Sequence, residues 1–517
     1  MGFIDSIAKE LNNETKLTEN GAVAYRTSGK KLLDLNFAVA SLRRASETEI
    51  VGKFMDAYFE DRITALKWLF YARDVREGLG ERRLFRVVME KFMAKEPNTT
   101  RELIKLVPEY GRWDDLWCLL ETDLVDDVVK LVHHQLAEDL ENMEMNKTIS
   151  LLSKWMPSLN ASSETTKKYA TILCKKMLHT PRSYRKMLSK MRKYIDVVEC
   201  KMSAKEWNAI NYETVPSRAN LIYNNAFLRN DEERRRAYLG ALEKGEAKIN
   251  ASTLFPHDIV HKYRFGNGTD ATLEGLWKAL PDTVKGCGNT IVVADGSGSM
   301  TCNVGGNSGV TALDVANSLA IYFAERSSGE FKDKYITFSE RPQLVDFSNA
   351  KNLREKLIIA RKHNEVANTN IEAVFDLILS TAINNHMTQD EIPANILIVS
   401  DMEFDSCATS GAVISRNSWG WYSSSLNRPT ATLFDTIAKK YAEHGYKLPR
   451  LVFWNVNSRT GTIPVKDNDL GVALVSGFSV NIVNMVMSNK LDPYECLLDT
   501  LNTKRYQPIE DAIEDII

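Results

Sequence analysis

Apolar residues recur at helical spacing through most of the first half of the chain. Ile50–Phe59 and Ile63–Ala72 both place apolar side chains three and four positions apart, the period of an amphipathic helix. Alternation of the kind that strands show is scarce from Leu35 to His261. Similar helical segments follow one another across short turns, at Arg83–Met93, Arg101–Val107, Asp114–Leu120, Leu124–Met143, Thr165–Leu178, Arg182–Val198, Ala204–Ile210 and Glu232–Glu243. Paired helices of this kind predict an α-solenoid of HEAT-like helical repeats, although the sequence shows no clean repeat unit.

The pattern changes after residue 289. Ile291–Ala294, Ile396–Ser400 and Leu451–Asn455 are short and almost continuously apolar, as in parallel strands that are buried on both faces. Helical patterns, at Val310–Arg326 and Ile371–Ile383 among others, lie between them. This alternation predicts an α/β domain with a doubly wound, Rossmann-like sheet.

The two patterns divide the chain into five parts. Residues 1–30 are polar and predict a flexible N-terminal arm, and residues 31–264 form the helical-repeat domain. Residues 265–289, rich in Gly, Thr and Asp, form the junction. Residues 290–490 form the α/β domain, and residues 491–517 form a C-terminal tail with one helix.

The composition is that of an ordinary soluble protein. The net charge of −2 over 517 residues argues against a uniformly basic nucleic-acid binder, but a local basic patch is compatible with it. Seven cysteines occur singly, without a C-x-x-C pair, so neither a zinc site nor a disulfide framework is indicated. No signal peptide is expected from the first residues, and no apolar run is long enough to predict a bilayer span. A reducing, cytoplasmic setting is expected.

Charge is unevenly distributed within the helical half. Residues 109–144 hold eleven acidic and two basic residues, whereas residues 167–205 hold twelve basic and two acidic residues. Six of these basic side chains share one predicted helix and are candidate RNA-binding residues: Arg182, Arg185, Lys186, Lys190, Arg192 and Lys193. The alternative is a solvated helix face that is ion-paired to the acidic neighbour.

Five oxygen-bearing side chains in the α/β half suggest a metal site. Asp295, Ser297 and Ser299 alternate with glycines directly after the first apolar strand, and Asp401 follows a second strand. Thr369 precedes a helix between the two strands. Loops at the carboxyl ends of such strands share one rim, and ligands that are all oxygen suit Mg²⁺, or another divalent cation such as Mn²⁺ or Ca²⁺. The alternative is a Ser/Gly turn with a helix-capping Thr.

This D-x-S-x-S, Thr, Asp order resembles the metal-ion-dependent adhesion site (MIDAS) of von Willebrand factor A (vWA) domains. With the helical half in front, the chain resembles the TROVE–vWA (Ro autoantigen-like) family, and more closely the uncharacterised TROVE-like proteins of phages, bacteria and plants. Besides the Asp295 motif, the resemblance is carried by the segments 72–82 (ARDVREGLGER), 111–116 (GRWDDL), 154–160 (KWMPSLN) and 215–218 (VPSR).

The resemblance implies a helical ring that binds small non-coding or misfolded RNA, and a metal site that recruits a protein partner offering a carboxylate. It implies no membrane partner and no specificity for DNA.

A long insertion after Asp401 carries a cluster of aromatic residues. Trp419, Trp421 and Tyr422 lie in a Ser/Asn-rich stretch that should overhang the predicted metal rim, where large aromatic side chains are typical of partner-binding hot spots. The alternatives are a lid or a packing contact with the helical half.

An enzyme is not indicated by the sequence. It contains no G-x-x-x-x-G-K-[ST], H-E-x-x-H or G-x-S-x-G motif, and no catalytic residue is assigned. The leading hypothesis is a ribonucleoprotein component, in which the helical repeats hold RNA and the metal rim recruits a protein. The alternative is a non-enzymatic scaffold or assembly factor with a Mg²⁺-dependent ligand and no RNA.

Overall fold

The computed structural model forms two compact units, each built from separated stretches of the chain. The sheet unit comprises Met1–Ala45, Phe255–Thr269 and Pro281–Thr500, and the helical unit comprises Ser46–Leu254, Asp270–Leu280 and Leu501–Ile517. The residues described are 15–20, 23–264, 268–284, 289–305, 309–338, 341–364, 370–404, 414–416, 422–424, 433–459, 461, 463–464, 472–480, 492–514 and 516.

The sheet unit is organised around a six-stranded sheet with the order β10-β9-β6-β3-β4-β5. All neighbouring strands are parallel except β5, which runs antiparallel to β4 at one edge. The central pair, β3 and β6, is fully or almost fully buried, which explains its continuous apolar sequence. The strands are β3 (Thr290–Asp295), β4 (Lys334–Phe338), β5 (Gln343–Asp346), β6 (Asn395–Ser400), β9 (Arg450–Asn455) and β10 (Val472–Ser476). The predicted mostly parallel, Rossmann-like sheet is therefore confirmed.

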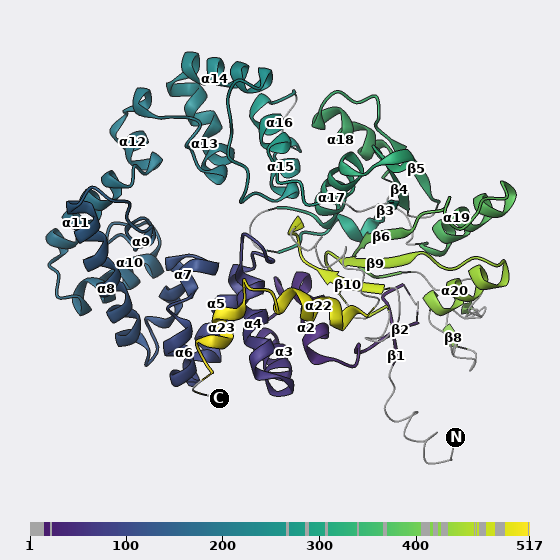
Figure 1. Ribbon diagram of the computed structural model, residues 1–517, viewed down its shortest axis with the longest axis horizontal. Helices are drawn as coiled ribbons and strands as arrows, with labels where there is room; N and C mark the ends of the chain where they lie inside the picture. Colours follow the sequence, from purple (N-terminus) through teal and green to yellow (C-terminus); the bar gives the residue numbers. More distant parts are fainter. Residues whose placement is uncertain are drawn as a thin grey trace. The chain divides into compact units, whose positions relative to one another are not determined.

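Helices from two separate parts of the sequence pack against this sheet (Figure 1). Helix α17 (Ala312–Arg326) lies against β3, β4 and β6, and α2 (Lys31–Leu42) lies against β9 and β10. Two hydrogen bonds join α2 to the strands, from Asn455 Nδ2 to Phe37 O at 2.8 Å and from Ala40 N to Ser476 Oγ at 3.0 Å. The unit also contains α15 (Pro256–Tyr263), η4 (Gly298–Thr301), η5 (Gly329–Phe331), α18 (Leu353–Lys362), α19 (Glu372–Asn384), α20 (Leu433–Glu443), α22 (Pro493–Leu501) and the paired strands β7 (Ile414–Arg416) and β8 (Tyr422–Ser424).

The described residues 15–20 and 23–30 form two paired strands and a turn in the part of the chain where polarity predicted a flexible arm. Strands β1 (Thr15–Leu17) and β2 (Val23–Tyr25) pair with each other, and Tyr25 exchanges two backbone hydrogen bonds with Ile463 at 2.8 and 2.9 Å. Backbone pairing does not depend on apolar side chains, so this short polar segment has no periodic pattern that would reveal it. The N-terminal segment is part of the sheet unit.

The helical unit confirms the all-helical prediction for the first half of the chain. Its elements are α3 (Glu47–Glu60), α4 (Arg62–Arg73), α5 (Arg82–Lys91), η1 (Met93–Lys95), α6 (Pro97–Leu103), α7 (Val107–Tyr110), η2 (Trp113–Leu119), α8 (Val125–Glu144), α9 (Leu152–Trp155), α10 (Glu164–Lys176), α11 (Pro181–Tyr194), α12 (Val198–Ala204), η3 (Trp207–Ala209), α13 (Ser217–Asn230), α14 (Glu232–Lys244), α16 (Ala271–Lys278) and α23 (Gln507–Asp511). The HEAT-like repeat and the ring stay predictions.

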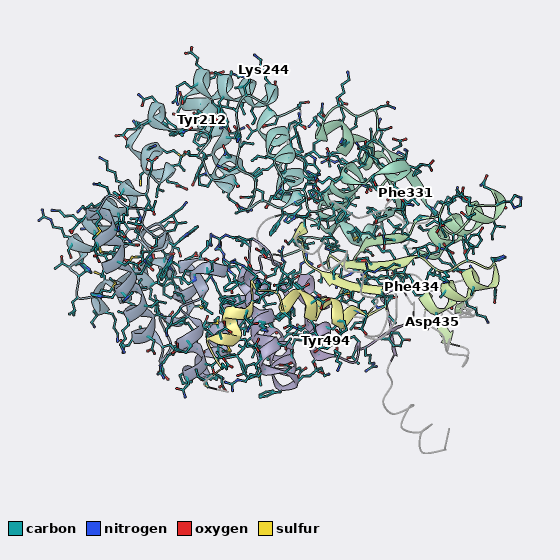
Figure 2. All side chains as sticks on the ribbon, viewed as in Figure 1. Tyr212, Lys244, Phe331, Phe434, Asp435 and Tyr494 are labelled. Carbon is teal, nitrogen blue, oxygen red and sulfur yellow. The ribbon has the colours of Figure 1, made fainter. Side chains whose placement is uncertain are left out.

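A fully buried arginine, Arg235, lies in the helical unit beside Tyr212, which Figure 2 labels. The Arg235 guanidinium donates hydrogen bonds to Asn220 Oδ1 at 3.2 Å and to Asn224 Oδ1 at 3.1 and 3.3 Å. Thr272 Oγ1 from α16 accepts a further bond at 3.4 Å, and the ring of Tyr212 lies 4.9 Å from the guanidinium. Helix α16 therefore completes this core, although it follows the predicted domain end at residue 264.

The C-terminal tail also belongs to the helical unit. Arg505 donates from Nε to Asp74 Oδ2 at 2.9 Å and from Nη1 to Glu109 Oε1 at 2.7 Å. Tyr506 is buried, and its ring packs on Tyr71 and Tyr110. The domain boundaries in the structure thus differ from those placed by composition at both ends of the chain and at the junction.

Candidate functional site

The predicted metal rim lies where β3 and β6 end. Asp295 is the last residue of β3, Ser400 is the last residue of β6, and Asp401 follows directly. The two strands are neighbours, but their connections lead to opposite sides of the sheet, because β4 follows β3 on one side and β9 follows β6 on the other. Such a reversal opens a crevice at the carboxyl ends of the strands, where α/β proteins bind ligands.

Hydrogen bonds fix the Asp295 carboxylate on the rim. It is buried and accepts a hydrogen bond from Ser297 N at 2.9 Å and another from Ser400 Oγ at 2.6 Å. The hydroxyls of Ser297 and Ser299 lie 3.0 Å apart. The structure therefore brings together the three side chains of the D-x-S-x-S motif and adds Ser400, which the sequence motif does not include.

Asp401 is the second buried carboxylate of the rim. Its Oδ1 accepts a hydrogen bond from Glu403 N at 3.3 Å, and its Oδ2 lies 3.4 Å from Arg459 Nη2. Burial raises the pKa of Asp401, and the nearby Asp295 carboxylate raises it further, while Ser299 and Arg459 oppose the rise. Thr369, the fifth predicted ligand, lies outside the described residues.

The chemistry of these side chains fits a hard divalent cation. Two buried carboxylates that repel one another become favourable when a cation neutralises them, and all the available donors are oxygens. Asp295, Ser297, Ser299 and Asp401 would hold such an ion, which would supply a Lewis-acidic contact for an anionic group. Nowhere in the described ranges do three or more His, Cys, Asp or Glu side chains gather as a metal cluster, and the predicted set has only two carboxylates.

Two charged residues from distant parts of the chain, Glu19 and Arg459, contact the rim at Glu403. Buried Glu403 accepts hydrogen bonds at 2.8 Å from Arg459 N and from Glu19 N. Arg459 also pairs with Glu19, with 2.6 Å between Nη2 and Oε2. Glu403 follows Asp401 by two residues, so its closeness to the rim can be predicted from the sequence. No local sequence signal connects Glu19 or Arg459 to the rim.

The predicted basic segment forms α11, whose start and packing follow from its sequence. Thr180 Oγ1 accepts a hydrogen bond from Ser183 N at 3.1 Å, and Pro181 occupies the first turn. Tyr184, Leu188 and Met191 are buried at helical spacing. The opposite face exposes five of the six predicted RNA-binding side chains: Arg182, Arg185, Lys186, Lys190 and Lys193.

Arg192, the sixth, turns toward the interior instead. Its guanidinium donates hydrogen bonds to Ser153 O at 2.9 Å, Ser158 Oγ at 2.9 Å and Met156 O at 2.7 Å. These bonds tie α11 to α9 and the turn after it, beside which α11 lies in Figure 1. Arg192 has a structural role in this arrangement, because its position one residue after Met191 places it at the edge of the buried face.

The exposed cations of α11 differ from the neighbouring lysines in their pairing. Lys168 pairs with Glu121, Lys176 lies 2.7 Å from Asp126, and Lys201 lies 2.7 Å from Asp196. The five exposed basic residues of α11 make no ion pair with any residue that the structure describes. Ion pairs with the acidic segment are therefore present on α10, at Lys168 and Lys176, and the described ranges contain none for the exposed cations of α11.

The predicted aromatic partner site falls largely outside the described residues. Trp419 and Trp421 lie in the undescribed stretch 417–421, and Tyr422 begins β8 without a described side chain. Whether these rings contact a partner stays a prediction. Among the helices that the structure describes, none is long and apolar enough to cross a membrane.

Comparisons with known proteins identify relatives of the whole chain. A family model described as a domain of unknown function (DUF2828) matches residues 18–122 and 121–289, and a second (DUF7788) matches residues 289–507. The uncharacterised protein L728 of Acanthamoeba polyphaga mimivirus is 30% identical over 95% of this chain and 88% of its own length.

A solved structure provides a more distant comparison. The crystal structure of the Deinococcus radiodurans Ro (RSR) protein aligns with 92% of this chain and 93% of its own, at 11% identity and a TM-score of 0.32. This likeness is too weak to establish a shared fold. The DUF2828 model, by contrast, covers just over half of the chain, and the mimivirus protein resembles nearly all of it. The chain therefore belongs to the DUF2828 family.

Proposed function

We propose that this protein binds RNA through the exposed basic face of α11. The observation that carries the proposal is the set of five exposed cations on one helix without ion-pair partners in the described structure. Exposed cations without ion-pair partners among the described residues are available to a polyanion, and each phosphate contact releases counterions. The ARDVREGLGER and GRWDDL segments resemble those of TROVE-like proteins and favour RNA as the polyanion.

The sheet rim supplies a second binding function in this proposal. Asp295, Ser297, Ser299 and Asp401 hold Mg²⁺, and a carboxylate from a protein partner fills an open position on the ion. Support comes from the two buried carboxylates at the strand reversal. The aromatic residues Trp419, Trp421 and Tyr422 would extend the partner surface. The protein would then be a non-enzymatic ribonucleoprotein component.

Exchange of three basic residues on α11 tests the proposal. The variant Arg185→Gln/Lys186→Gln/Lys190→Gln should bind single-stranded RNA more weakly at every sequence, measured by fluorescence anisotropy at several salt concentrations. The slope of log K against log salt should fall by about 0.7 for each phosphate that the variant no longer neutralises, or roughly 2 in total.

The matched control removes three lysines that already have acidic partners. Lys167→Gln/Lys168→Gln/Lys176→Gln changes the net charge by the same amount, but these side chains pair with Glu164, Glu121 and Asp126. RNA affinity and slope should stay near those of the unmodified protein. An equal loss in both variants would mean that net charge rather than the α11 face determines binding. If the protein binds no RNA even at low salt, the result would favour the scaffold hypothesis, in which the metal rim is the binding site and RNA has no part.

A further inference from the structure

Two of the motif segments in the helical unit meet in a cluster of arginines. ARDVREGLGER ends α4 and leads into α5, whereas GRWDDL leads into η2, which lies against α5. Arg73, Arg82 and Arg86 come from the first region, and Arg112 comes from the second. Within the described structure, two carboxylates, Asp114 and Asp115, pair with these four guanidinium groups.

The inner layer of this cluster is saturated. Asp115 is fully buried and accepts hydrogen bonds from Arg73 Nε and Arg86 Nε, each at 2.7 Å, and from Arg112 N at 3.0 Å. Burial disfavours the Asp115 charge, but Arg73 and Arg86 outweigh this effect and hold its pKa below the usual value. This layer is a buried ion pair that joins η2 to α4 and α5.

The outer layer has an excess of positive charge. Asp114 is the carboxylate shared by Arg86 at 2.9 Å, Arg112 at 3.0 Å and Arg82 at 3.9 Å. The side chain of Arg82 is 45% exposed and makes no hydrogen bond to a residue within the described ranges. Burial lowers the pKa of Arg82 to about 10, and the like charges of Arg112 and Arg86 contribute to the shift.

An aromatic ring limits the outer layer on one side. The Arg112 guanidinium lies 4.0 Å from the ring centre of half-buried Trp155, which orients it. Among the described residues, the buried nitrogens Arg86 Nη2 and Arg112 Nε contact Asp114 as ion pairs without a directed hydrogen bond, whereas Arg112 Nη2 donates one to Asp114 Oδ2 at 3.1 Å. Preoriented donors with this excess of charge match the tetrahedral oxygens of a phosphate.

We infer that Arg82, Arg86 and Arg112 form a binding site for one phosphate group, with Asp114 as the residue that balances the site when it is empty. The inference rests on the proposed function in one respect, because RNA would supply the phosphate, either at a 5′ end or within the chain. The site lies on η2 and α5, so it is distinct from the basic face of α11.

Inorganic phosphate is the direct probe of this site. We expect phosphate to raise the melting temperature of the full chain above that in chloride at equal ionic strength, and Arg82→Gln to weaken phosphate binding about tenfold in calorimetry. Arg82 suits this test because its side chain is held in the cluster only by the 3.9 Å ion pair among the residues that the structure describes. Arg83→Gln, an equal charge change at the exposed neighbouring position, should bind phosphate normally.

A second variant separates an anion site from a purely structural ion-pair network. Asp114→Asn leaves three guanidinium groups without their shared carboxylate, so phosphate should bind more tightly and recover much of the lost melting temperature. A structural network would lose stability without recovery by phosphate. If Asp114→Asn does not fold, the comparison of Arg82→Gln with Arg83→Gln decides, and equal phosphate affinities in those two variants overturn the inference.

RNA oligonucleotides distinguish the source of the phosphate. A 5′-phosphorylated oligomer that loses more affinity on Arg82→Gln than its 5′-hydroxyl counterpart identifies a chain end, whereas equal losses identify an internal phosphodiester. Loss of RNA binding in the α11 variant with phosphate binding unchanged by Arg82→Gln would overturn this inference and leave the proposed function intact. Phosphate binding that depends on Arg82, in a protein that binds no RNA, would do the reverse.

Discussion

At the scale of single residues, buried charge is concentrated in two places with opposite local balance. In the helical unit Asp115 is surrounded by guanidinium groups, whereas at the sheet rim Asp295 and Asp401 face one another. In the first arrangement, the guanidinium groups of the protein already neutralise the carboxylate. The second favours an added cation, because two carboxylates repel one another there and Arg459 Nη2, 3.4 Å from Asp401 Oδ2, is the cationic contact that the described residues provide for Asp401.

Replacement of Asp115 should strongly destabilise the helical unit. Asp115→Asn leaves Arg73 buried without its carboxylate, and breaking such a pair costs about 3–5 kcal/mol. The pKa of Asp115 is lowered in the folded state, so its contribution is present above the ordinary aspartate pKa and disappears as pH falls through the folded value. Thermal melts should therefore separate the variant from the unmodified protein at pH 7 and converge in acid.

The control for this prediction is an aspartate in an exposed ion pair. Asp126→Asn breaks the contact with Lys176 on the surface, where solvent screens the pair, so it should lower the melting temperature far less than Asp115→Asn does. If the Asp115 and Asp126 variants melt alike at pH 7, the buried network does not contribute the stability assigned to it.

Replacement of Asp295 should have opposite effects on the melting temperature without Mg²⁺ and with it. Without the ion, Asp295→Asn removes repulsion toward Asp401 and should melt at or above the temperature of the unmodified protein. With Mg²⁺ at a hundred times its Kd, the unmodified protein should gain about 2.7 kcal/mol and overtake the variant. Asp346→Asn on the edge strand should keep the full response. A melting temperature of the unmodified protein that is the same with Mg²⁺ and with a chelator would contradict the predicted site.

How far the sequence reveals these residues depends on their spacing. Asp295, Ser297 and Ser299 are recognisable because three donors fall in one tight loop directly after a buried strand. Arg459 and Glu19 reach the same rim from loops with no periodic or motif signal. The arginine network shows the same limit, because pairing of Arg73 with Asp115 joins positions 42 residues apart and cannot be deduced from local pattern.

At the scale of elements, amphipathic periodicity is the property that predicts best. Helix α11 has apolar residues at 184, 188 and 191, so its buried face and its exposed cations follow directly from the sequence. The strands β3, β6 and β9 are equally clear, because both faces of each strand are buried. In both kinds of element, the local sequence pattern is enough to predict which side chains are buried.

Elements whose environment is set by distant partners are the ones that the sequence misses. The β1–β2 pair is three residues long in each strand and depends on Ile463 for its backbone bridge. Arg192 shows the same effect within a well-predicted helix, since its hydrogen-bond acceptors lie on α9 and in the turn after it. Charge runs therefore predict a basic helix reliably but not which of its cations remain available.

At the scale of the whole molecule, the chain passes back and forth between its two units. The sheet unit takes α2 from the N-terminal region, and the helical unit takes α16 from within the predicted junction and the C-terminal tail from beyond it. Composition places one boundary at residues 265–289, because Gly, Thr and Asp gather there. Composition does not reveal the exchanged segments, because α2 and α16 are helices like their neighbours. Only their packing shows to which unit each of them belongs.

These exchanged segments predict which fragments of the chain fold. Fragment 31–264 carries α2 without β9 and β10, so this helix loses the strands that it packs against. It also lacks Thr272, which accepts from buried Arg235 and donates to Asn224 Oδ1 at 2.8 Å. Fragment 46–280 omits α2 and keeps α16, and both fragments carry α15 without α17, so α15 does not distinguish them. We expect 46–280 to be monomeric with a cooperative thermal melt, and 31–264 to aggregate or melt broadly.

The tail provides the decisive addition to this experiment. Both fragments lack residues 501–517, which leaves the buried carboxylate of Asp74 without Arg505 and the ring of Tyr110 without Tyr506. A peptide of residues 501–517 added to fragment 46–280 should therefore raise its melting temperature in a concentration-dependent way. The same peptide with Arg505→Ala should have little effect, because the charge of Asp74 stays uncompensated. Equal stability of the two fragments, together with no response to either peptide, would mean that the exchanged segments do not determine how the helical unit folds.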